Sequence, residues 1–422
     1  MTPEIKHRIG QIRRGDVPER YVKTALGLAP TDWKRYTFGD IYTERKEPGD
    51  ENLPLLMVSI HSGVSDGEVD AAELPKQVKR IEDKSQYKKA VSGDLVFNMM
   101  RAWQGAIGTV RTTGMVSPAY IVAEPNDKAY PLFMDYYSRT PQMINQIDRQ
   151  SYGVTDFRKR LYWDSFAPIS CTLPPIEEQQ KIATILTTQD RVIELKEKRL
   201  AEKQRQKKYL MQQLLTGKKR LPGFSGEWKN IKLCEVLSER KEKNVEQNLR
   251  ICSVAVQKGV VDQVEHLGRS YAANDTSNYS VAHYGDIIYT KSPTGDFLYG
   301  IVKQNLLQET VAVSPLYGVF TPLTFGLGYF LHTYFQSAIC ARNYLLPIVQ
   351  KGAKNTINIT NDTFISSKLY LPLDVEEQKA IADTFIAADR EIELLRQDIR
   401  QEKQKKKALM QLLLTGIVRV KT

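Results

Sequence analysis

The residue patterns that most often carry chemistry are scarce in this 422-residue sequence. It contains no Gly-x-x-x-x-Gly-Lys-Ser/Thr phosphate-binding loop and no Gly-x-Gly-x-x-Gly dinucleotide motif. Residues 325–328 (Phe-Gly-Leu-Gly) only superficially resemble a cofactor-binding glycine motif. The Asn/Asp-Pro-Pro-aromatic motif of amino-methyltransferases is missing, and residues 172–175 (Thr-Leu-Pro-Pro) do not supply it. We therefore expect a chain without a catalytic centre of its own.

Weaker patterns also fail to build a catalytic or metal site. Residues 32–34 (Asp-Trp-Lys) have the Asp-x-Lys spacing of some nucleases, but no upstream acidic residue on a paired strand accompanies them. The histidines lie far apart without metal-ligand spacing, and no two cysteines form a Cys-x-x-Cys pair. We therefore expect no metal site, histidines that pack or lie on the surface, and reduced thiols. These residues are His7, His61, His266, His283, His332, Cys171, Cys234, Cys252 and Cys340.

The net charge of +11 is concentrated in two segments. Residues 177–220 contain twelve lysines and arginines against six acidic residues, and residues 376–421 contain ten against eight. These segments carry +6 and +2, which leaves +3 for the rest of the chain. A basic surface is typical of nucleic-acid-binding proteins, but solvated helix faces are a common cause of basic charge, so charge alone does not establish DNA binding.

The two basic segments belong to a sequence duplication. Residues 173–179 (Leu-Pro-Pro-Ile-Glu-Glu-Gln) return about 198 positions later as residues 371–378 (Leu-Pro-Leu-Asp-Val-Glu-Glu-Gln). Aligning residues 177–221 with residues 376–420 gives about 20 identities in 45 positions. This period is much longer than the roughly 20–50 residues of a solenoid repeat. The sequence therefore predicts two related domains, each followed by its own helix.

Both duplicated segments are predicted to be long α-helices. Their apolar residues recur at spacings of three and four, each segment opens after a proline with Glu-Glu in its first turn, and each stops at Thr-Gly. A helix over residues 177–215 would be about 58 Å long at ~1.5 Å per residue. The predicted helix-pairing seam comprises Ile182, Leu186, Ile193, Leu200, Ile381, Phe385, Ile392, Leu395 and Ile399.

The charges along the two helices favour an antiparallel pair. Residues 177–194 sum to −2 and residues 195–215 to +5, while residues 376–395 sum to −4 and residues 396–414 to +4. In an antiparallel pair each acidic half faces a basic half. The alternative is that each gradient only complements the dipole of its own helix. We prefer the pair, because the apolar seams still need a partner.

The duplication continues more faintly through the rest of each half. Residues 93–97 (Gly-Asp-Leu-Val-Phe) match residues 285–289 (Gly-Asp-Ile-Ile-Tyr), which predicts a turn that leads into a buried strand. The loops that follow differ, since residues 99–105 (Met-Met-Arg-Ala-Trp-Gln-Gly) stand opposite residues 290–295 (Thr-Lys-Ser-Pro-Thr-Gly). A shared frame with different loops indicates two domains that do the same kind of job on different targets.

With these repeated motifs the chain resembles the DNA-specificity subunit of type I restriction-modification systems over essentially its whole length. The resemblance rests on the doubled Leu-Pro-Pro/Leu, Glu-Glu-Gln and Leu-Leu-Thr-Gly motifs and on the connector at residues 221–224 (Leu-Pro-Gly-Phe). It implies that each variable domain is a target-recognition domain for one half of a split double-stranded DNA site. Half-sites about one duplex turn apart, roughly 34–36 Å, could be bridged by such helices.

The resemblance also implies partners and cofactors. The helices would form an antiparallel spacer and dock two modification (methyltransferase) subunits, and the complex would recruit restriction (motor-nuclease) subunits. S-adenosylmethionine and ATP/Mg would bind only in those partner subunits, so this chain would hold no cofactor. The leading segment up to about Gly27 would pack beside the carboxy-terminal helix. A two-armed assembly scaffold that does not read DNA is the alternative, and a nuclease or other enzyme ranks third.

Candidate DNA contacts lie in the divergent loops and in the segments that precede each helix. Arginine, lysine, asparagine and glutamine can make paired hydrogen bonds to base edges, whereas lysine, serine and threonine often only hold phosphate. A solvated loop remains the alternative for each residue. The candidates are Asn98, Arg101, Trp103, Gln104, Tyr152, Thr155, Arg158, Lys159 and Arg160 in the first half, and Lys291, Ser292, Thr294, Lys351, Lys354, Asn355 and Thr356 in the second.

The expected fold class is α+β, with two mixed α/β target-recognition domains joined by two long antiparallel α-helices in a pseudo-two-fold duplication. The predicted division is residues 1–172 and 219–370 for the two domains and residues 173–218 and 371–422 for the helices. No apolar run reaches the ~18 residues of a membrane span, and the first residues show no hydrophobic signal region. We therefore expect a cytoplasmic protein.

Overall fold

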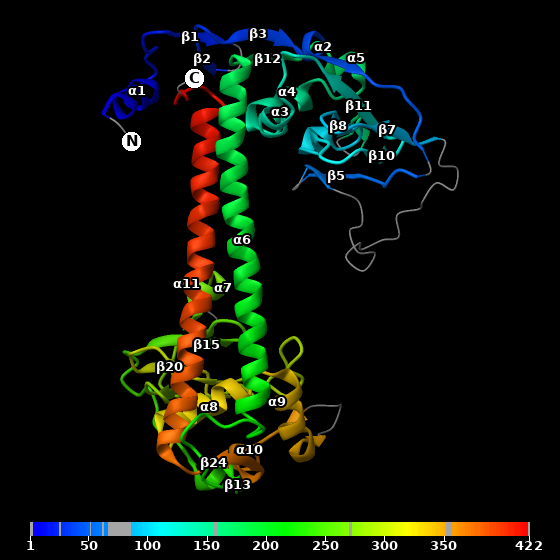
Figure 1. The fold of residues 1–422 in the computed structure, drawn as a ribbon. Coiled ribbons are helices and arrows are strands. Elements are labelled where there is room, and N and C mark those ends of the chain that lie inside the picture. Colours follow the sequence, from blue (N-terminus) through cyan, green and yellow to red (C-terminus); the bar gives the residue numbers. More distant parts are fainter. Residues whose placement is uncertain are drawn as a thin grey trace. The chain divides into compact units, whose positions relative to one another are not determined.

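The computed structural model describes residues 3–24, 27–50, 52–60, 63–65, 86–155, 158–269, 272–351 and 357–420, apart from the side chains of residues 350, 351, 357 and 358. The chain folds as two compact units (Figure 1). The first unit consists of Met1–Leu195 together with Ile399–Thr422, and the second consists of Lys196–Asp398. None of the described helices is long and apolar enough to cross a membrane.

An antiparallel four-stranded sheet in the order β4-β11-β8-β9 lies at the centre of the first unit. Successive residues of a strand point to opposite faces, and here both faces are covered. Leu95 and Phe97 pack into one apolar core, while Val96 packs into another. The strands of this sheet are β4 (Tyr42–Glu44), β8 (Leu95–Asn98), β9 (Ile107–Thr109) and β11 (Tyr120–Pro125).

Short paired strands and helices complete the first unit. Its antiparallel pairs are β1 (Tyr21–Thr24) with β2 (Gly27–Pro30), β3 (Lys34–Thr37) with β12 (Ser170–Leu173), β5 (Met57–Ser59) with β6 (Gly63–Ser65), and β7 (Lys88–Ala90) with β10 (Gly114–Val116). Its helices before α6 are α1 (Pro3–Arg13), α2 (Phe38–Ile41), η2 (Ala102–Gln104), α3 (Pro131–Tyr137), α4 (Pro141–Arg149) and α5 (Trp163–Phe166).

The second unit repeats the central sheet in the order β14-β21-β18-β19 and adds a second sheet, β16-β15-β20-β17, in which β15 and β20 run parallel. The central strands are β14 (Leu237–Glu239), β18 (Ile287–Tyr289), β19 (Val302–Gln304) and β21 (Gly318–Pro322). The strands of the added sheet are β15 (Arg250–Ala255), β16 (Gly259–Asp262), β17 (Ser280–Ala282) and β20 (Val311–Val313).

The remaining elements of the second unit follow the pattern of the first. Two antiparallel pairs join β13 (Trp228–Lys232) to β24 (Lys368–Pro372) and β22 (Gln350–Lys351) to β23 (Ile357–Asn358). The helices are η4 (Leu233–Glu235), α7 (Gln263–Leu267), α8 (Phe325–Tyr334), α9 (Ala338–Leu345), η5 (Leu346–Ile348) and α10 (Asn361–Ser366). The predicted α+β class and the internal duplication are therefore confirmed at the level of element order.

Two helices of 39 residues each, α6 (Ile176–Leu214) and α11 (Val375–Leu413), are the longest elements of the chain (Figure 1). Within the first unit Gln189 donates to Glu402 and Lys406 pairs with Asp190. Within the second unit Lys196 pairs with Asp398 at 2.8 Å, and Lys203 pairs with Glu391 at 2.9 Å. Residue numbers rise along one helix as they fall along the other, so the antiparallel arrangement is confirmed.

The Lys203–Glu391, Lys207–Asp389 and Lys406–Asp190 ion pairs join an acidic segment to a basic one, as the two charge gradients predict, whereas Lys196 and Asp398 both lie in net-basic segments. The gradients therefore serve the helix pair as well as the dipole of each helix. Of the predicted seam residues, seven are buried and two are half-buried. The buried residues are Ile182, Leu186, Ile193, Ile381, Phe385, Ile392 and Ile399, and the half-buried ones are Leu200 and Leu395.

Candidate nucleic-acid interface

The Asp-x-Lys triplet at residues 32–34 is part of an ion-pair network. The Asp32 carboxylate accepts two hydrogen bonds of 2.7 Å from the Arg419 guanidinium, which lowers the pKa of Asp32. The Trp33 indole N–H donates to the buried Glu178 at 3.3 Å. Both side chains are thus engaged in packing the start of α6 against residues that follow α11.

The glycines of residues 325–328 serve close packing on α8. A Cβ on Gly326 would lie 2.9 Å from the backbone nitrogen of Lys379, and one on Gly328 would lie 2.4 Å from the Gln304 amide nitrogen. His332 on the same helix is buried and accepts the Gln304 backbone N–H at its Nδ1. Among the described residues, no group of three or more histidine, cysteine or acidic side chains could hold a metal ion.

One match to a hydrolase motif does occur, at residues 63–67 (Gly-Val-Ser-Asp-Gly), which have the Gly-x-Ser-x-Gly spacing. That motif requires a sharp strand-to-helix turn that exposes the serine. Gly63–Ser65 instead forms strand β6 of a hairpin, and the Ser65 hydroxyl donates to the Met57 carbonyl at 3.4 Å. The described part of this segment therefore does not present Ser65 as a nucleophile.

The first set of predicted DNA contacts lies on the tight loop between β8 and β9. The loop closes through Asn98 N–H to Ala106 O at 3.0 Å, and Gly105 adopts a φ of 104°, a left-handed conformation that favours glycine. Asn98 is turned into the loop, where its side-chain oxygen accepts the Met100 N–H at 2.9 Å. Arg101 and Gln104 are exposed, and Trp103 is half-buried.

The second set lies on a narrow hairpin that precedes α5. Tyr152 and Arg160 exchange backbone hydrogen bonds of 2.9 and 2.7 Å at its base. A Cβ on Gly153 would lie 2.5 Å from the backbone carbon of Arg158, so the two arms of the hairpin touch. Tyr152, Thr155 and Arg158 are exposed, whereas Lys159 and Arg160 are half-buried.

The fold brings these two sets together. The Leu161 N–H, next to the hairpin, donates to the Met99 carbonyl at 2.8 Å. The Lys159 ammonium lies 5.0 Å from the centre of the Trp103 ring. Segments that are some fifty positions apart in sequence therefore form one continuous surface with three arginines and one lysine: Arg101, Arg158, Lys159 and Arg160.

In the second unit the loop between β18 and β19 spans residues 290–301 and carries the predicted contacts Lys291, Ser292 and Thr294. Lys291 is half-buried with a φ of 59°, and burial lowers its pKa, which the Glu239 charge partly offsets. Ser292 and Thr294 are exposed. Thr294 and Phe297 exchange backbone hydrogen bonds of 3.0 Å, which turn the loop back toward α9.

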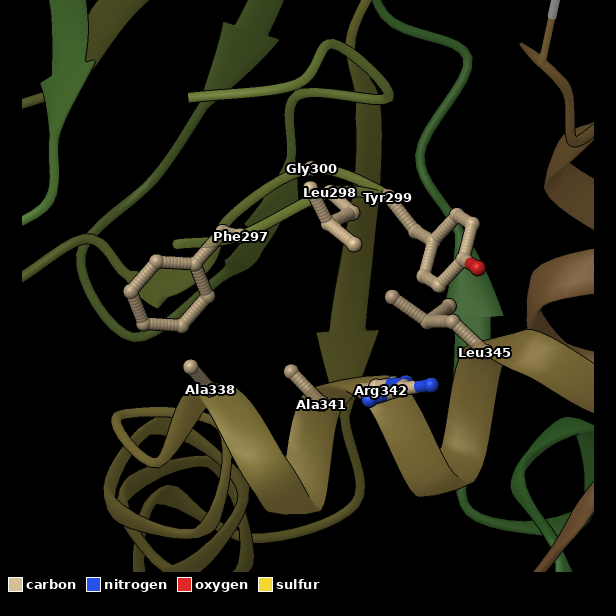
Figure 2. Close-up of a pocket in the computed structure, with 8 residues that line it drawn as sticks. All are labelled: Phe297, Leu298, Tyr299, Gly300, Ala338, Ala341, Arg342 and Leu345. Carbon is tan, nitrogen blue, oxygen red and sulfur yellow. The ribbon is translucent and has the colours of Figure 1, made fainter. Parts of the chain in front are cut away.

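The predicted DNA contacts do not include the far side of this loop. Figure 2 shows residues 297–300 above α9, with Arg342 beside Leu298, Tyr299 and Leu345 in a shallow niche. Arg342 and Leu298 are exposed. Arg342 is therefore a further candidate for DNA contact. It lies in an ordinary helical pattern, so only its contact with a loop some forty residues upstream distinguishes it.

The segment before α10 in the second unit forms a hairpin in the register of its counterpart. Gln350 pairs with Asn358, as Tyr152 pairs with Arg160, so both hairpins span eight positions. Lys351 lies in β22, but its side chain is not described. The predicted contacts Lys354, Asn355 and Thr356 lie outside the described residues.

Beneath the loops, each unit contains the same pair of charges. Arg45 donates to Asp94 at 2.8 Å, and Arg240 donates to Asp286 at 2.6 Å. Each carboxylate also accepts a backbone N–H at 2.8 Å, from Val91 in the first unit and from His283 in the second. These pairs tie the start of the central strand to the strand at the edge of its sheet. They explain the repeated Gly-Asp motif and the arginine of a second repeat, Glu-Arg-Lys-Glu, at residues 44–47 and 239–242.

The comparisons with known proteins agree with this duplicated frame. A family model described as type I restriction modification DNA specificity domain matches residues 71–204 and again residues 226–403. The chain is 24% identical to the type I restriction enzyme MjaVIII specificity subunit of Methanocaldococcus jannaschii, over 96% of this chain and 97% of that protein.

Two solved structures have a similar fold. The type I restriction-modification system S subunit from M. genitalium is 10% identical and matches with a TM-score of 0.53 over 92% of this chain and 97% of its own. A chain from a structure that describes complex assembly and conformational transition of the type I R-M system is 17% identical, with a TM-score of 0.50 over 92% of this chain and 99% of its own.

Proposed function

This chain belongs to the type I restriction-modification DNA specificity family, and from that premise we propose that it reads a two-part, asymmetric site in double-stranded DNA, one half-site with each unit. One observation in particular supports the proposal. The two segments predicted to contact DNA in the first unit lie together, joined by the Leu161 to Met99 hydrogen bond. Their exposed arginines and glutamine are the side-chain types that pair with base edges.

The proposed readers of the first half-site are the exposed side chains of this surface. Arg101 and Arg158 suit guanine, whose O6 and N7 accept a pair of hydrogen bonds, and Gln104 suits adenine. Tyr152 and Thr155 are exposed and have hydroxyl groups, which commonly contact the DNA backbone and set register without reading sequence. In the second unit the proposed readers of the other half-site are Lys291, Ser292 and Thr294, together with Arg342.

The asymmetry of the proposed site follows from the loops. Residues 98–106 and residues 290–301 are closed by the same backbone hydrogen bond of 3.0 Å, but the second loop is three residues longer. The first presents arginine and glutamine, and the second presents lysine, serine and threonine. Because the two donor sets differ, we expect the two half-sites to differ in sequence.

The finer division of labour is also part of the proposal. The helix pair docks two modification subunits, and these carry S-adenosylmethionine and methylate the DNA. Motor-nuclease subunits join that complex and use ATP and Mg. In this account the chain itself catalyses nothing, binds no cofactor and acts in the cytoplasm. The predicted division at residues 172, 218 and 370 defines the four functional segments.

Selection from random DNA tests the proposal. The full chain is purified with its modification subunits and incubated with a pool of random duplexes, and the retained molecules are sequenced. We expect enrichment of two short unlike sequences separated by a fixed gap. A complex that assembles but enriches no sequence would support the assembly-scaffold alternative instead. Methyl transfer by the purified single chain would contradict the non-catalytic role.

The spacer role has its own test. Inserting four residues into each long helix adds about 6 Å along the axis, close to two base-pair steps of ~3.4 Å. We expect the gap between the half-sites to widen by about that amount. An unchanged gap with retained methylation would show that these helices do not set the distance.

A further inference from the structure

Lys159, one of the predicted DNA contacts, is already engaged inside the first unit. Its ammonium lies 2.7 Å from the Asp148 carboxylate and 5.0 Å from the centre of the Trp103 ring. The side chain is only 22% exposed. The Trp103 indole N–H donates to the Met100 carbonyl at 3.0 Å, which fixes the ring in this orientation. A cation held by a carboxylate and a ring face has little freedom to reach a base.

These contacts join three separate elements. Trp103 belongs to the loop after β8, Asp148 to helix α4, and Lys159 to the narrow hairpin. The hairpin has its own backbone bonds between Tyr152 and Arg160, which close it on itself, and the Leu161 to Met99 bond attaches only its base to the loop. The contacts of Lys159 fix the position of the hairpin's exposed arm relative to the loop. We call Lys159, Asp148 and Trp103 the clamp.

The second unit lacks charges at the matching positions. Counting back one residue from the paired ends of the hairpins, Arg160 and Asn358, places Ile357 opposite Lys159. Counting eight residues from the helix N-caps, Thr140 and Ser337, places the fully buried Leu345 opposite Asp148. The first unit therefore uses an ion pair where the second has two aliphatic residues.

From these contacts we propose that Lys159 is a positioning residue of the first half-site reader, and that it acts through Asp148 and Trp103 rather than by contacting a base. The clamp holds the hairpin against the loop, so that Arg101, Gln104 and Arg158 form one rigid surface. This inference deepens the proposed DNA-reading function and rests on it.

A substitution at Asp148 distinguishes the positioning role of Lys159 from a direct contact between Lys159 and DNA. A carboxylate beside the DNA backbone repels phosphate, so neutralising it should strengthen binding if Lys159 simply holds a phosphate. If Asp148 instead holds the clamp, neutralising it should weaken binding, because the exposed arm of the hairpin loses its side-chain attachment and only the base stays bonded to the loop. The two accounts thus predict opposite signs for Asp148→Asn.

The experiment uses the full chain and a fluorescein-labelled duplex that carries the site obtained by selection, together with duplexes in which either half-site is scrambled. We expect Lys159→Met and Asp148→Asn each to lower affinity about fivefold. Both should reduce the penalty for scrambling one half-site and leave the other penalty unchanged. Lys159→Arg should retain affinity, since arginine can pair with Asp148 and stack on Trp103.

Lys128→Met is the matched control, because Lys128 also lies over a ring, Tyr36, at 5.7 Å, but belongs to no candidate DNA segment. Hydrogen exchange gives a readout that needs no DNA. Amides of residues 152–161 should exchange faster in Lys159→Met and in Asp148→Asn, and not in the control.

Three results would overturn the inference. The first is stronger DNA binding by Asp148→Asn together with weaker binding by Lys159→Met, which would make Lys159 a phosphate contact. The second is unchanged exchange over residues 152–161 in both variants. The third is a wild-type chain that selects no sequence at all. That result would remove the proposed function and the positioning role with it, whereas the first two would leave the function intact.

Discussion

Glu178, at the start of α6 in the first unit, is fully buried and accepts hydrogen bonds from Trp33 and Arg419. Glu377, at the start of α11 in the second unit, accepts the same bonds from Trp228 and Arg220. Tyr136 and Tyr329 likewise donate to Asp190 and Asp389. The duplication has thus preserved the buried polar contacts that orient the elements, with a different partner segment supplying each arginine.

The tips of the two units, by which we mean the loop after β8 or β18 and the hairpin before α5 or α10, differ, whereas the buried frames agree. In the first unit the charged clamp adds to the backbone hydrogen bond between loop and hairpin, while the second unit has Ile357 and Leu345 at the positions that match Lys159 and Asp148. The second unit also adds a whole sheet with a parallel strand pair. A frame whose geometry depends on buried hydrogen bonds is constrained, because an unpaired buried group is costly, whereas exposed loops are free to vary.

The largest effect is expected where the helices pack in the second unit. Ile392 is buried and Leu395 is half-buried, so replacing both with aspartate places unpaired charges against an apolar seam, at a cost of about 5 kcal/mol in the free energy of unfolding. Urea denaturation of the full chain measures it. Leu394→Asp is the control, because Leu394 is 55% exposed and its replacement should change stability little. Equal losses from both variants would contradict the assigned seam.

The two buried glutamates test whether the frames are equivalent. Removing one partner of a buried ion pair leaves an uncompensated charge and costs about 3 kcal/mol. Glu377→Ala should therefore lower the free energy of unfolding by about that amount, and Glu178→Ala should lower it less, because Arg419 keeps its ion pair with Asp32. Hydrogen exchange, measured separately for the strand pair β3 with β12 and the strand pair β13 with β24, assigns each loss of stability to its unit. A loss confined to one unit, with none in the other, would break the equivalence of the two frames.

A smaller effect should distinguish the units by pH. The amide of the last residue of the edge strand donates to Asp135 in the first unit, from Thr109 of β9, but to His332 in the second, from Gln304 of β19. Burial holds the pKa of His332 well below its usual value, and the charges of Lys303 and Lys207 lower it further. The folded state therefore leaves His332 neutral at a pH where the unfolded chain already binds the proton.

His332 consequently does not reduce the free energy of unfolding of the second unit above pH ~6.5. Below that pH the free energy of unfolding falls, by up to about 1.4 kcal/mol per pH unit. His332→Gln, which keeps an acceptor for Gln304 but cannot titrate, should flatten this dependence. Urea unfolding between pH 7 and pH 5 measures both proteins. A dependence that is the same in the variant would show that His332 is not its source.

The sequence was most informative for the long helices. Their period, caps and charge gradients are local signals, and the predicted helix over residues 177–215 differs by one residue at each end from Ile176–Leu214. The ion pairs Asp190–Lys406 and Lys207–Asp389 then join the acidic and basic stretches that the gradients matched. Local periodicity could predict these elements because each helix satisfies its own backbone hydrogen bonds.

The candidate interface was harder to predict, because its geometry depends on contacts between distant residues. The sequence spacing of Asp148, Trp103 and Lys159 does not predict that they are in contact. The same holds for Arg419 and Glu178, which are 241 positions apart. The loop alignment was also wrong in detail. Sequence similarity set Gly105 opposite Gly295, but Gly300, with a φ of 99°, occupies its place before the next strand. Strand pairing decides that correspondence.

The central claim is that the two units read different half-sites through independent tips on one repeated frame. Exchanging residues 1–172 for the same segment of a relative with a different specificity, and selecting bound duplexes from a random pool, tests it most directly. The account predicts that one half-site changes to that of the relative while the other half-site and the gap stay as they were. A hybrid in which both half-sites change, or in which neither does, would contradict it.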